Sequence, residues 1–155
     1  MGGDQPAPAF RYVEAPDHPG WMTWELADRS RFNALFGPFL LKVEDGIARV
    51  RMTPRPLHAN LSGKVHGGAL LGFVDMAIFA AARGFGLIEA GTAVTLDLNA
   101  QFIGRAEIEA SIEARVELLR ETGRLLFLRG LIVQPVDEPS ETVLAFSGTI
   151  RKPSR

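Results

Sequence analysis

The second half of the chain alternates apolar and polar residues with a period of two, which is typical of β-strands that bury one face. The alternation is unbroken over residues 94–102 and again over residues 107–118. Glu, Ala and Leu in the second stretch are good helix formers, but a dozen residues of period two outweigh that weaker preference. Two further strands are expected at residues 124–134, where Gly130 indicates a bulge, and at residues 142–150.

The segment 65–83 has a different pattern and predicts the one long helix of the chain. It is rich in Ala, Leu, Met and Phe, and Gly84 and Gly86 follow it as stop signals. Asp75 is the only charged residue between positions 67 and 82. A helix that is apolar on all sides is buried on all sides. We therefore expect a sheet that wraps around this helix.

The region before the helix predicts a hairpin and a shorter helix. Residues 39–44 and 47–52 are short apolar runs separated by Asp45-Gly46, a pair that tolerates the positive φ angles of a tight hairpin. Residues 26–36 are expected to form a short helix that Gly37-Pro38 stops. The sum is an α+β fold in which one long helix lies among five or six antiparallel strands.

The composition fits a single folded domain. The chain has 155 residues, of which 46% are hydrophobic, enough for one core and too few for two domains. We expect this domain to span residues 32–152, with a tail and the short helix in residues 1–31. The N-terminus lacks the pattern of a secretory signal, so we expect a cytoplasmic protein.

Charge and residue types exclude several classes of function. The net charge is −1, from 17 basic and 18 acidic residues, so neither nucleic acid nor an anionic membrane is expected as a partner. The absence of cysteine excludes disulfides, thiol nucleophiles and Cys-based zinc sites, and the three histidines lack metal-ligand spacing. The longest apolar run, residues 67–82, is shorter than the ~20 residues of a membrane span.

The long helix carries two features that could support chemistry. A carboxylate on an apolar helix is costly to desolvate, so Asp75 should be paired, open to a cavity or used in a reaction. The purely structural explanation would be a hydrogen bond between Asp75 and a neighbouring strand or an ion pair with Arg83. His66-Gly67-Gly68 begins the same helix, where the first N–H groups have no internal acceptors and glycine lets a substrate approach. The same three residues would also suit an ordinary helix start capped by His66.

These residues belong to a longer motif. Asn60 is followed six residues later by His-Gly-Gly, Asp75 lies nine residues after the histidine, and Thr95 supplies a hydroxyl on the next strand. From about Phe32 to Lys152 the chain resembles the hotdog-fold acyl-CoA thioesterases, in the branch related to the phenylacetate-pathway thioesterase. The resemblance implies a long helix wrapped in an antiparallel sheet. It also implies a homodimer or homotetramer with active sites at the dimer interface.

The resemblance also assigns roles to individual residues. The N–H of Gly67 would polarise the thioester carbonyl, and Asp75 would act as general base on water or as nucleophile. Thr95 would help to place the water, and Asn60 and His66 would position the thioester group. The residues expected to contact the substrate are Gly68, Phe102, Arg120, Gly123 and Arg124, the last three in a turn where the family often contacts coenzyme A. No cofactor or metal is implied.

The spacing within the helix agrees with a shared site. Gly67 and Asp75 are eight residues apart, which is ~12 Å along a helix axis at 1.5 Å per residue. One thioester cannot be polarised by the first and attacked from the second within a single chain. Two antiparallel copies of the helix, related by a two-fold axis, would bring Gly67 of one copy near Asp75 of the other.

The sequence therefore predicts an enzyme that hydrolyses an acyl-CoA or aroyl-CoA to the free acid and CoA. A hotdog hydratase acting on enoyl thioesters is the nearest enzymatic alternative, but Asp75 on the helix and Thr95 on the strand fit hydrolysis better. A non-catalytic acyl-CoA-binding protein is the alternative from another class. Such a protein would keep the fold and the pocket while losing the base, and Asp75 is present.

Overall fold

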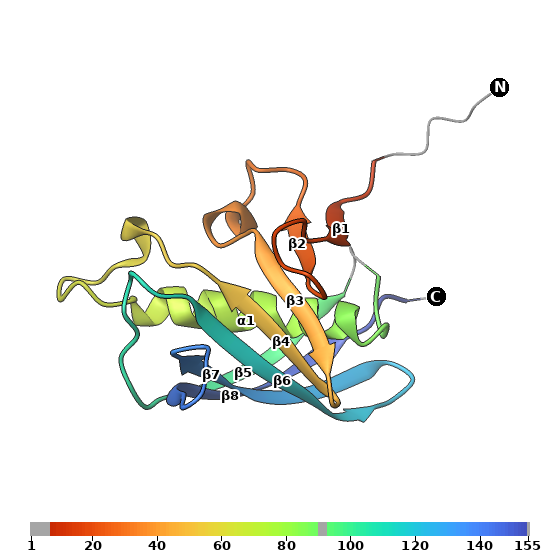
Figure 1. The fold of residues 1–155 in the computed structure, drawn as a ribbon. Helices are drawn as coiled ribbons and strands as arrows, with labels where there is room; N and C mark the ends of the chain where they lie inside the picture. Colours follow the sequence, from red (N-terminus) through yellow and green to blue (C-terminus); the bar gives the residue numbers. More distant parts are fainter. Residues whose placement is uncertain (1–6, 90–92, 155) are drawn as a thin grey trace.

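The computed structural model describes residues 7–89 and 93–154, and it contains one α-helix lying across a curved antiparallel sheet (Figure 1). In this part of the chain the sheet has eight strands in the order β1-β2-β3-β4-β6-β7-β8-β5. The elements are β1 (Phe10–Glu14), β2 (Met22–Leu26), β3 (Phe39–Glu44), β4 (Ile47–Met52), α1 (Gly67–Gly84), β5 (Val94–Phe102), β6 (Ile112–Glu121), β7 (Leu125–Gln134) and β8 (Glu141–Arg151). The α+β hotdog arrangement predicted from the sequence is confirmed, with six strands from β3 onward and two more before them.

Helix α1 is buried on most of its surface but not on all of it. It contacts all six strands from β3 to β8, and Phe73, Val74 and Ile78 are completely buried. The expectation of burial on every side is nevertheless wrong, because Leu71 is 38% exposed and neighbouring Gly68 is exposed as well. An apolar stripe of the helix is therefore left open in a single chain.

Strand β5 forms one edge of the sheet beside this open stripe. It pairs with β8 on one side, and its other side has no partner in the described chain. Leu96 is 50% exposed and Phe102 is 54% exposed on this strand. An unpaired edge offers a row of free N–H and C=O groups for another chain. Residues of β5 and of the open stripe of α1 line one shared cavity, among them Thr95, Leu98, Gly68 and Leu71.

The N-terminal region contains a β-hairpin where the sequence predicted a tail and a short helix. Strand β2 runs through Leu26, and only a single 3-10 turn, η1 (Phe32–Leu35), follows it. Trp24 of β2 is 4% exposed and stacks on Phe10 of β1, with ring centroids 4.4 Å apart. Burial of this aromatic pair outweighs the weak helix preference of the segment. Because β2 also pairs with β3, no break in the sheet separates residues before 32 from those after it.

Strand β6 begins later than the alternation predicted. The strand starts at Ile112 rather than at position 107. The side chain of Gln134 explains the difference, because its Nε2 donates to the carbonyls of Glu107 and Ala110 at 3.1 and 2.9 Å. Its Oε1 also accepts from the Glu107 N–H at 2.6 Å. These bonds hold residues 107–111 in a turn although their sequence alternates.

Gly130 of β7 marks a close approach of strands and not the bulge that its position suggested. A Cβ at this residue would lie 2.2 Å from the Arg115 carbonyl oxygen and 2.6 Å from the ring of Phe146. The irregularity in the pairing of β7 with β8 falls instead between Ile132 and Val133. Glycine is needed here because any side chain would collide with β6 and β8.

Candidate active site

Asp75 and Thr95 form a hydrogen-bonded pair between the helix and the edge strand. The Thr95 Oγ1 donates to Oδ1 of Asp75 at 2.7 Å, and both residues are half-buried. The second oxygen of the carboxylate, Oδ2, has no hydrogen bond to any described group. The pair thus holds the carboxylate in place through one oxygen and leaves the other available.

A bulge in β5 directs Thr95 toward the helix. The register of β5 with β8 shifts between Thr95 and Asp97, so that Leu96 is the extra residue. The shift reverses the alternation: Thr95 and Leu98 are partly buried, whereas strict alternation would place them on opposite faces. The bulge therefore turns a residue of the apparently polar face toward Asp75.

His66 and Gly67 form the start of α1. His66 is the N-cap, and its Nδ1 accepts from the Gly68 N–H at 2.8 Å, so a neutral ring carries its proton on the exposed Nε2. The Gly67 N–H has no acceptor among the residues that the structure describes. A Cβ at Gly67 would lie 3.3 Å from Cε1 of Phe102. Two donors and an aromatic ring thus surround the positive end of the helix.

Asn60 and His58 shape the loop that leads into the helix. Oδ1 of Asn60 accepts from the N–H groups of Ser62 and Lys64 at 2.9 and 3.0 Å. His58, which was not among the predicted site residues, is 3% exposed, and its carbonyl accepts from the His66 N–H at 2.7 Å. Burial lowers the pKa of His58, so its ring stays neutral. No pattern around a single loop histidine could have indicated this supporting role.

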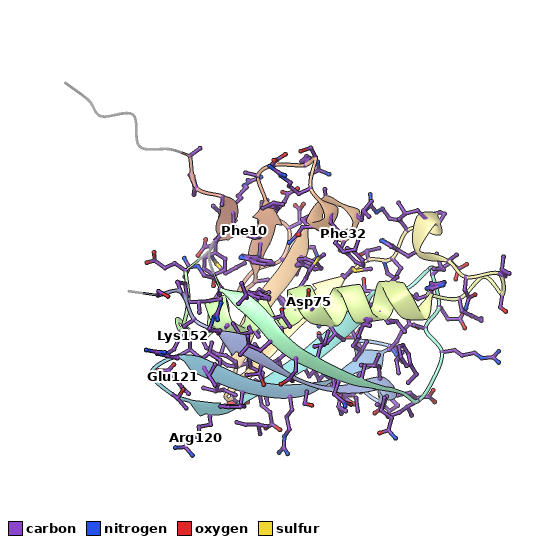
Figure 2. All side chains as sticks on the ribbon, turned by 180° about the vertical axis from the view of Figure 1, so that it is seen from behind. Phe10, Phe32, Asp75, Arg120, Glu121 and Lys152 are labelled. Atoms are coloured by element: carbon purple, nitrogen blue, oxygen red, sulfur yellow. The ribbon has the colours of Figure 1, made fainter. Side chains whose placement is uncertain are left out.

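Two cavities meet at Asp75 and Thr95. The smaller one, about 340 Å³, lies between the open stripe of α1 and β5 and is also lined by Gly68, Leu71, Gly72 and Leu98. The larger one, about 670 Å³, lies between the second half of α1 and the N-terminal hairpin. Figure 2 shows Asp75 near the middle of the helix, with Phe10 and Phe32 above it. We call the larger space the hairpin cavity. Its aromatic lining was not predicted, because no local pattern in the sequence indicated the hairpin.

The turn expected to bind coenzyme A lies at another part of the molecule. Gly123 and Arg124 line a polar cavity of about 1140 Å³ near the C-terminus, together with Lys152, whereas Arg120 does not line it. Figure 2 shows Arg120 near the end of β6 and Lys152 just beyond the end of β8, both away from Asp75. This polar cavity and the hairpin cavity both include Ile88 and Glu89 in their walls. Substrate contact by the turn stays a prediction.

The predicted site residues thus form three groups in one chain. Asp75 and Thr95 are bonded, Gly67 lies against Phe102, and the turn that holds Arg124 is separate from both. Within residues 7–89 and 93–154 no cluster of three or more His, Asp or Glu side chains could hold a metal ion. The chemistry that the arrangement offers is that of a carboxylate, a hydroxyl and a helix N-terminus.

Comparison with known proteins connects this geometry to a family. The model of the thioesterase superfamily matches residues 62–139, half of the chain, and this segment includes His66, Gly67, Asp75 and Thr95. No curated protein matches the chain.

Several solved structures share the fold. The TT0310 protein from Thermus thermophilus is 29% identical, with 77% of this chain and 94% of that chain covered and a TM-score of 0.59. A mutant of the phenylacetic acid degradation protein PaaI from the same organism is 26% identical, with 77% and 96% covered and a TM-score of 0.61. A hypothetical thioesterase from Streptococcus pneumoniae, solved with coenzyme A, is 17% identical, with 79% and 91% covered and a TM-score of 0.65. On the family match and the helix-in-sheet fold together, this chain belongs to the thioesterase superfamily.

Proposed function

We propose that the protein hydrolyses an acyl-CoA or aroyl-CoA thioester to the free carboxylic acid and CoA. The observation that carries the proposal is the 2.7 Å hydrogen bond between Thr95 and Asp75 at the junction of two cavities. A carboxylate held through one oxygen, beside a space large enough for a substrate, is suited to general base or nucleophilic catalysis. Membership of the thioesterase superfamily and the coenzyme A bound in the Streptococcus pneumoniae structure support the choice of substrate.

The carboxylate of Asp75 drives the reaction. As a base, its free Oδ2 takes a proton from water while the water oxygen attacks the thioester carbon; as a nucleophile, the same oxygen attacks the carbon directly. Thr95 already donates its proton to Oδ1, so its own oxygen can accept a hydrogen bond from the attacking water. In the base route the tetrahedral intermediate expels the CoA thiolate, which takes the proton that Asp75 removed from water. In the nucleophilic route loss of the thiolate leaves an acyl–Asp75 anhydride. A water molecule then hydrolyses this anhydride to the free acid and the Asp75 carboxylate, and a proton of that water goes to the thiolate.

The oxyanion of the intermediate requires hydrogen-bond donors on the opposite side of the thioester. The N–H of Gly67 and the Nε2–H of His66 are suitable donors at the positive end of a helix. Gly67 and Asp75 of the same helix are ~12 Å apart along its axis, so the donors must come from a second copy.

We therefore propose a homodimer, or a tetramer of such dimers, in which two α1 helices pack antiparallel. The stripe formed by Gly68 and Leu71 is apolar and exposed, and Gly68 has no side chain, so two helices can approach closely. The free edge of β5 continues the same surface. A two-fold axis through this surface creates two identical sites, each with Asp75 of one subunit and the partner subunit's Gly67.

A thiol-release assay over a panel of acyl-CoA substrates tests the proposed function. We expect free CoA from at least one substrate, with a rate that collapses when Asp75 is replaced by Asn. Loss of an enoyl chromophore without release of thiol would instead identify a hydratase. Tight binding of acyl-CoA with no turnover of any substrate would contradict hydrolysis and favour a binding protein.

A further inference from the structure

We propose that the N-terminal hairpin and the η1 turn form the wall of the acyl-binding pocket, and that the enzyme selects a bulky apolar acyl group through this wall. The inference rests on the proposed thioesterase function and specifies the substrate class of the same site. The hairpin lies outside residues 62–139, the segment that matches the family. The catalytic pair is therefore within the matched segment, and the proposed specificity wall is outside it.

The floor of the hairpin cavity is one face of α1. Asp75, Met76, Phe79 and Arg83 line it, at spacings that place them along the same side of the helix. From Asp75 to Arg83 this floor is ~12 Å long at 1.5 Å per residue. An acyl group whose thioester carbon lies at Asp75 therefore has a continuous channel toward the end of the helix.

The opposite wall is aromatic and comes from the hairpin and the turn after it. Phe10 stacks on Trp24 with an interplanar angle of 10°, and Trp24 packs in turn on Phe39 at 6.0 Å between ring centroids. This stack is held by the core, so its position does not depend on a ligand. Phe32 of η1 completes the wall and is 64% exposed in the single chain. An exposed aromatic ring beside a cavity is a surface that an apolar ligand would cover.

Each charged side chain that lines the hairpin cavity is paired, exposed or assigned to the reaction, so the interior of the cavity is apolar. The guanidinium of Arg31 is ion-paired with Asp28 at 2.9 Å. The guanidinium of Arg83 lies over the ring of Tyr12, 4.6 Å from its centroid. Glu89 is exposed, and Asp75 is the carboxylate assigned to the reaction. The aromatic and aliphatic side chains are therefore free to contact the acyl group.

The size of the cavity favours a large acyl group. A volume of about 670 Å³ is in the range of sites that enclose drug-sized ligands. An acetyl group would leave most of this space without contacts, whereas each further buried methylene adds about fourfold to kcat/KM until the cavity is filled. We expect octanoyl-CoA and phenylacetyl-CoA to be hydrolysed far more efficiently than acetyl-CoA, and the two large substrates separate an alkyl from an aryl preference.

Two variants of the same turn test the wall. Phe32→Ala removes an exposed ring of the cavity, and Leu35→Ala removes a side chain that is 43% exposed in η1 but outside the cavity lining. We expect Phe32→Ala to lower kcat/KM for the large substrates about tenfold, mainly through KM, and to leave acetyl-CoA within twofold. Leu35→Ala should leave all three substrates unchanged.

A binding measurement makes the test independent of turnover. The chain has two tryptophans, so Trp21→Phe leaves Trp24 as the only one, and its fluorescence reports on the wall. Titration with a non-hydrolysable octanoyl-CoA thioether should change this fluorescence, and the acetyl analogue should not.

The outcomes separate the two proposals. Absence of thiol release from every substrate would overturn the proposed function. Hydrolysis with equal efficiency for acetyl and octanoyl substrates, or an equal effect of Phe32→Ala on both, would overturn the acyl wall and leave the thioesterase function standing. If the octanoyl analogue bound without changing the fluorescence of Trp24, the proposed acyl wall would also be wrong.

Discussion

Two carboxylates, one on strand β6 and the other on helix α1, have contrasting environments. Glu113 of β6 is completely buried and accepts hydrogen bonds from Arg49 at 2.9 Å, Arg51 at 2.5 Å and Arg115 at 2.8 Å. Asp75 is half-buried, has one hydrogen bond from a neutral hydroxyl and faces two cavities. A buried carboxylate bonded to three cations is a structural element, whereas one with a free oxygen beside a cavity is available for chemistry.

The largest expected effect comes from removing the available carboxylate. Asp75→Asn keeps the shape of the side chain and loses the base, so kcat should fall ~100-fold or more. The free energy of unfolding should change little, because only one hydrogen bond to a neutral group is affected. Steady-state thiol release and chemical denaturation measure the two quantities. Near-normal turnover in this variant would remove Asp75 from the mechanism.

Glu113→Gln should give the opposite result. Three guanidinium groups would lose their shared anion, and breaking a buried ion pair costs ~3–5 kcal/mol. We expect about 3 kcal/mol of lost stability, the low end of that range, because the arginine side chains keep 21–25% of their surface exposed. Below the unfolding transition kcat should stay within twofold of wild type. A large loss of kcat in the folded variant would contradict the division between the two carboxylates.

The loss of stability at acidic pH should reflect protonation of the Glu113 carboxylate. Burial raises the pKa of this carboxyl, but hydrogen bonds from Arg115, Arg51 and Arg49 outweigh burial and hold its pKa below the ordinary value. A depressed folded pKa stabilises the native state above the unfolded pKa, ~4.3 for glutamate, and the contribution is lost as the pH falls through the folded value. The denaturant concentration at the midpoint of unfolding should therefore decrease as the pH is lowered below about 4.5 in the wild type. This component of the decrease should be absent in Glu113→Gln.

Thr95→Ala should have a smaller effect on catalysis than Asp75→Asn. The hydroxyl orients the carboxylate and the water but takes no proton, so we expect kcat to fall about tenfold, within the range for loss of a positioning hydrogen bond. Thr95→Ser, which keeps the hydroxyl, should recover most of that activity. If Thr95→Ser were as slow as Thr95→Ala, the contribution of Thr95 would be packing and not the 2.7 Å hydrogen bond.

The sequence predicted best where a local pattern determines the structure. Residues 39–44, 47–52 and 94–102 form strands with the predicted bounds, because alternation and the Asp45-Gly46 turn are local signals. The helix was predicted within two residues at each end. The Asn-His-Gly-Gly-Asp motif likewise indicated the family, whose model matches residues 62–139, and the catalytic roles of its residues stay predictions.

Long-range contacts explain what the sequence could not predict. The N-terminal hairpin depends on stacking of Trp24 on Phe10 and on pairing with β3, neither of which is visible in a five-residue pattern. Glu113 alternates like an exposed residue but is buried, because three arginines of β4 and β6 converge on it. The orientation of Thr95 depends on a bulge that a perfect alternation conceals.

The last prediction tests whether Gly67 of a second subunit completes the site around Asp75. Gly67→Pro removes the proposed oxyanion N–H at the first position of α1, where proline is tolerated. The added ring would press on Phe102, whose Cε1 lies 3.3 Å from a Cβ at this position, but Phe102 is 54% exposed and can turn away. Each single variant, Gly67→Pro or Asp75→Asn, lacks one half of both sites in its homodimer and should be nearly inactive.

Mixed dimers of the two variants should recover activity. One site would join the intact Gly67 of the Asp75→Asn subunit to the intact Asp75 of the Gly67→Pro subunit, and the other site would carry both changes. Equal amounts that reassort at random make about half of the dimers mixed, so activity should return to roughly a quarter of wild type. Each variant refolded alone is the control, with circular dichroism for folding and light scattering for the dimer. Folded variants that exchange subunits without regaining activity would show that Gly67 and Asp75 do not meet across an interface. The group that faces the free oxygen of Asp75 would then have to come from elsewhere than the partner's helix.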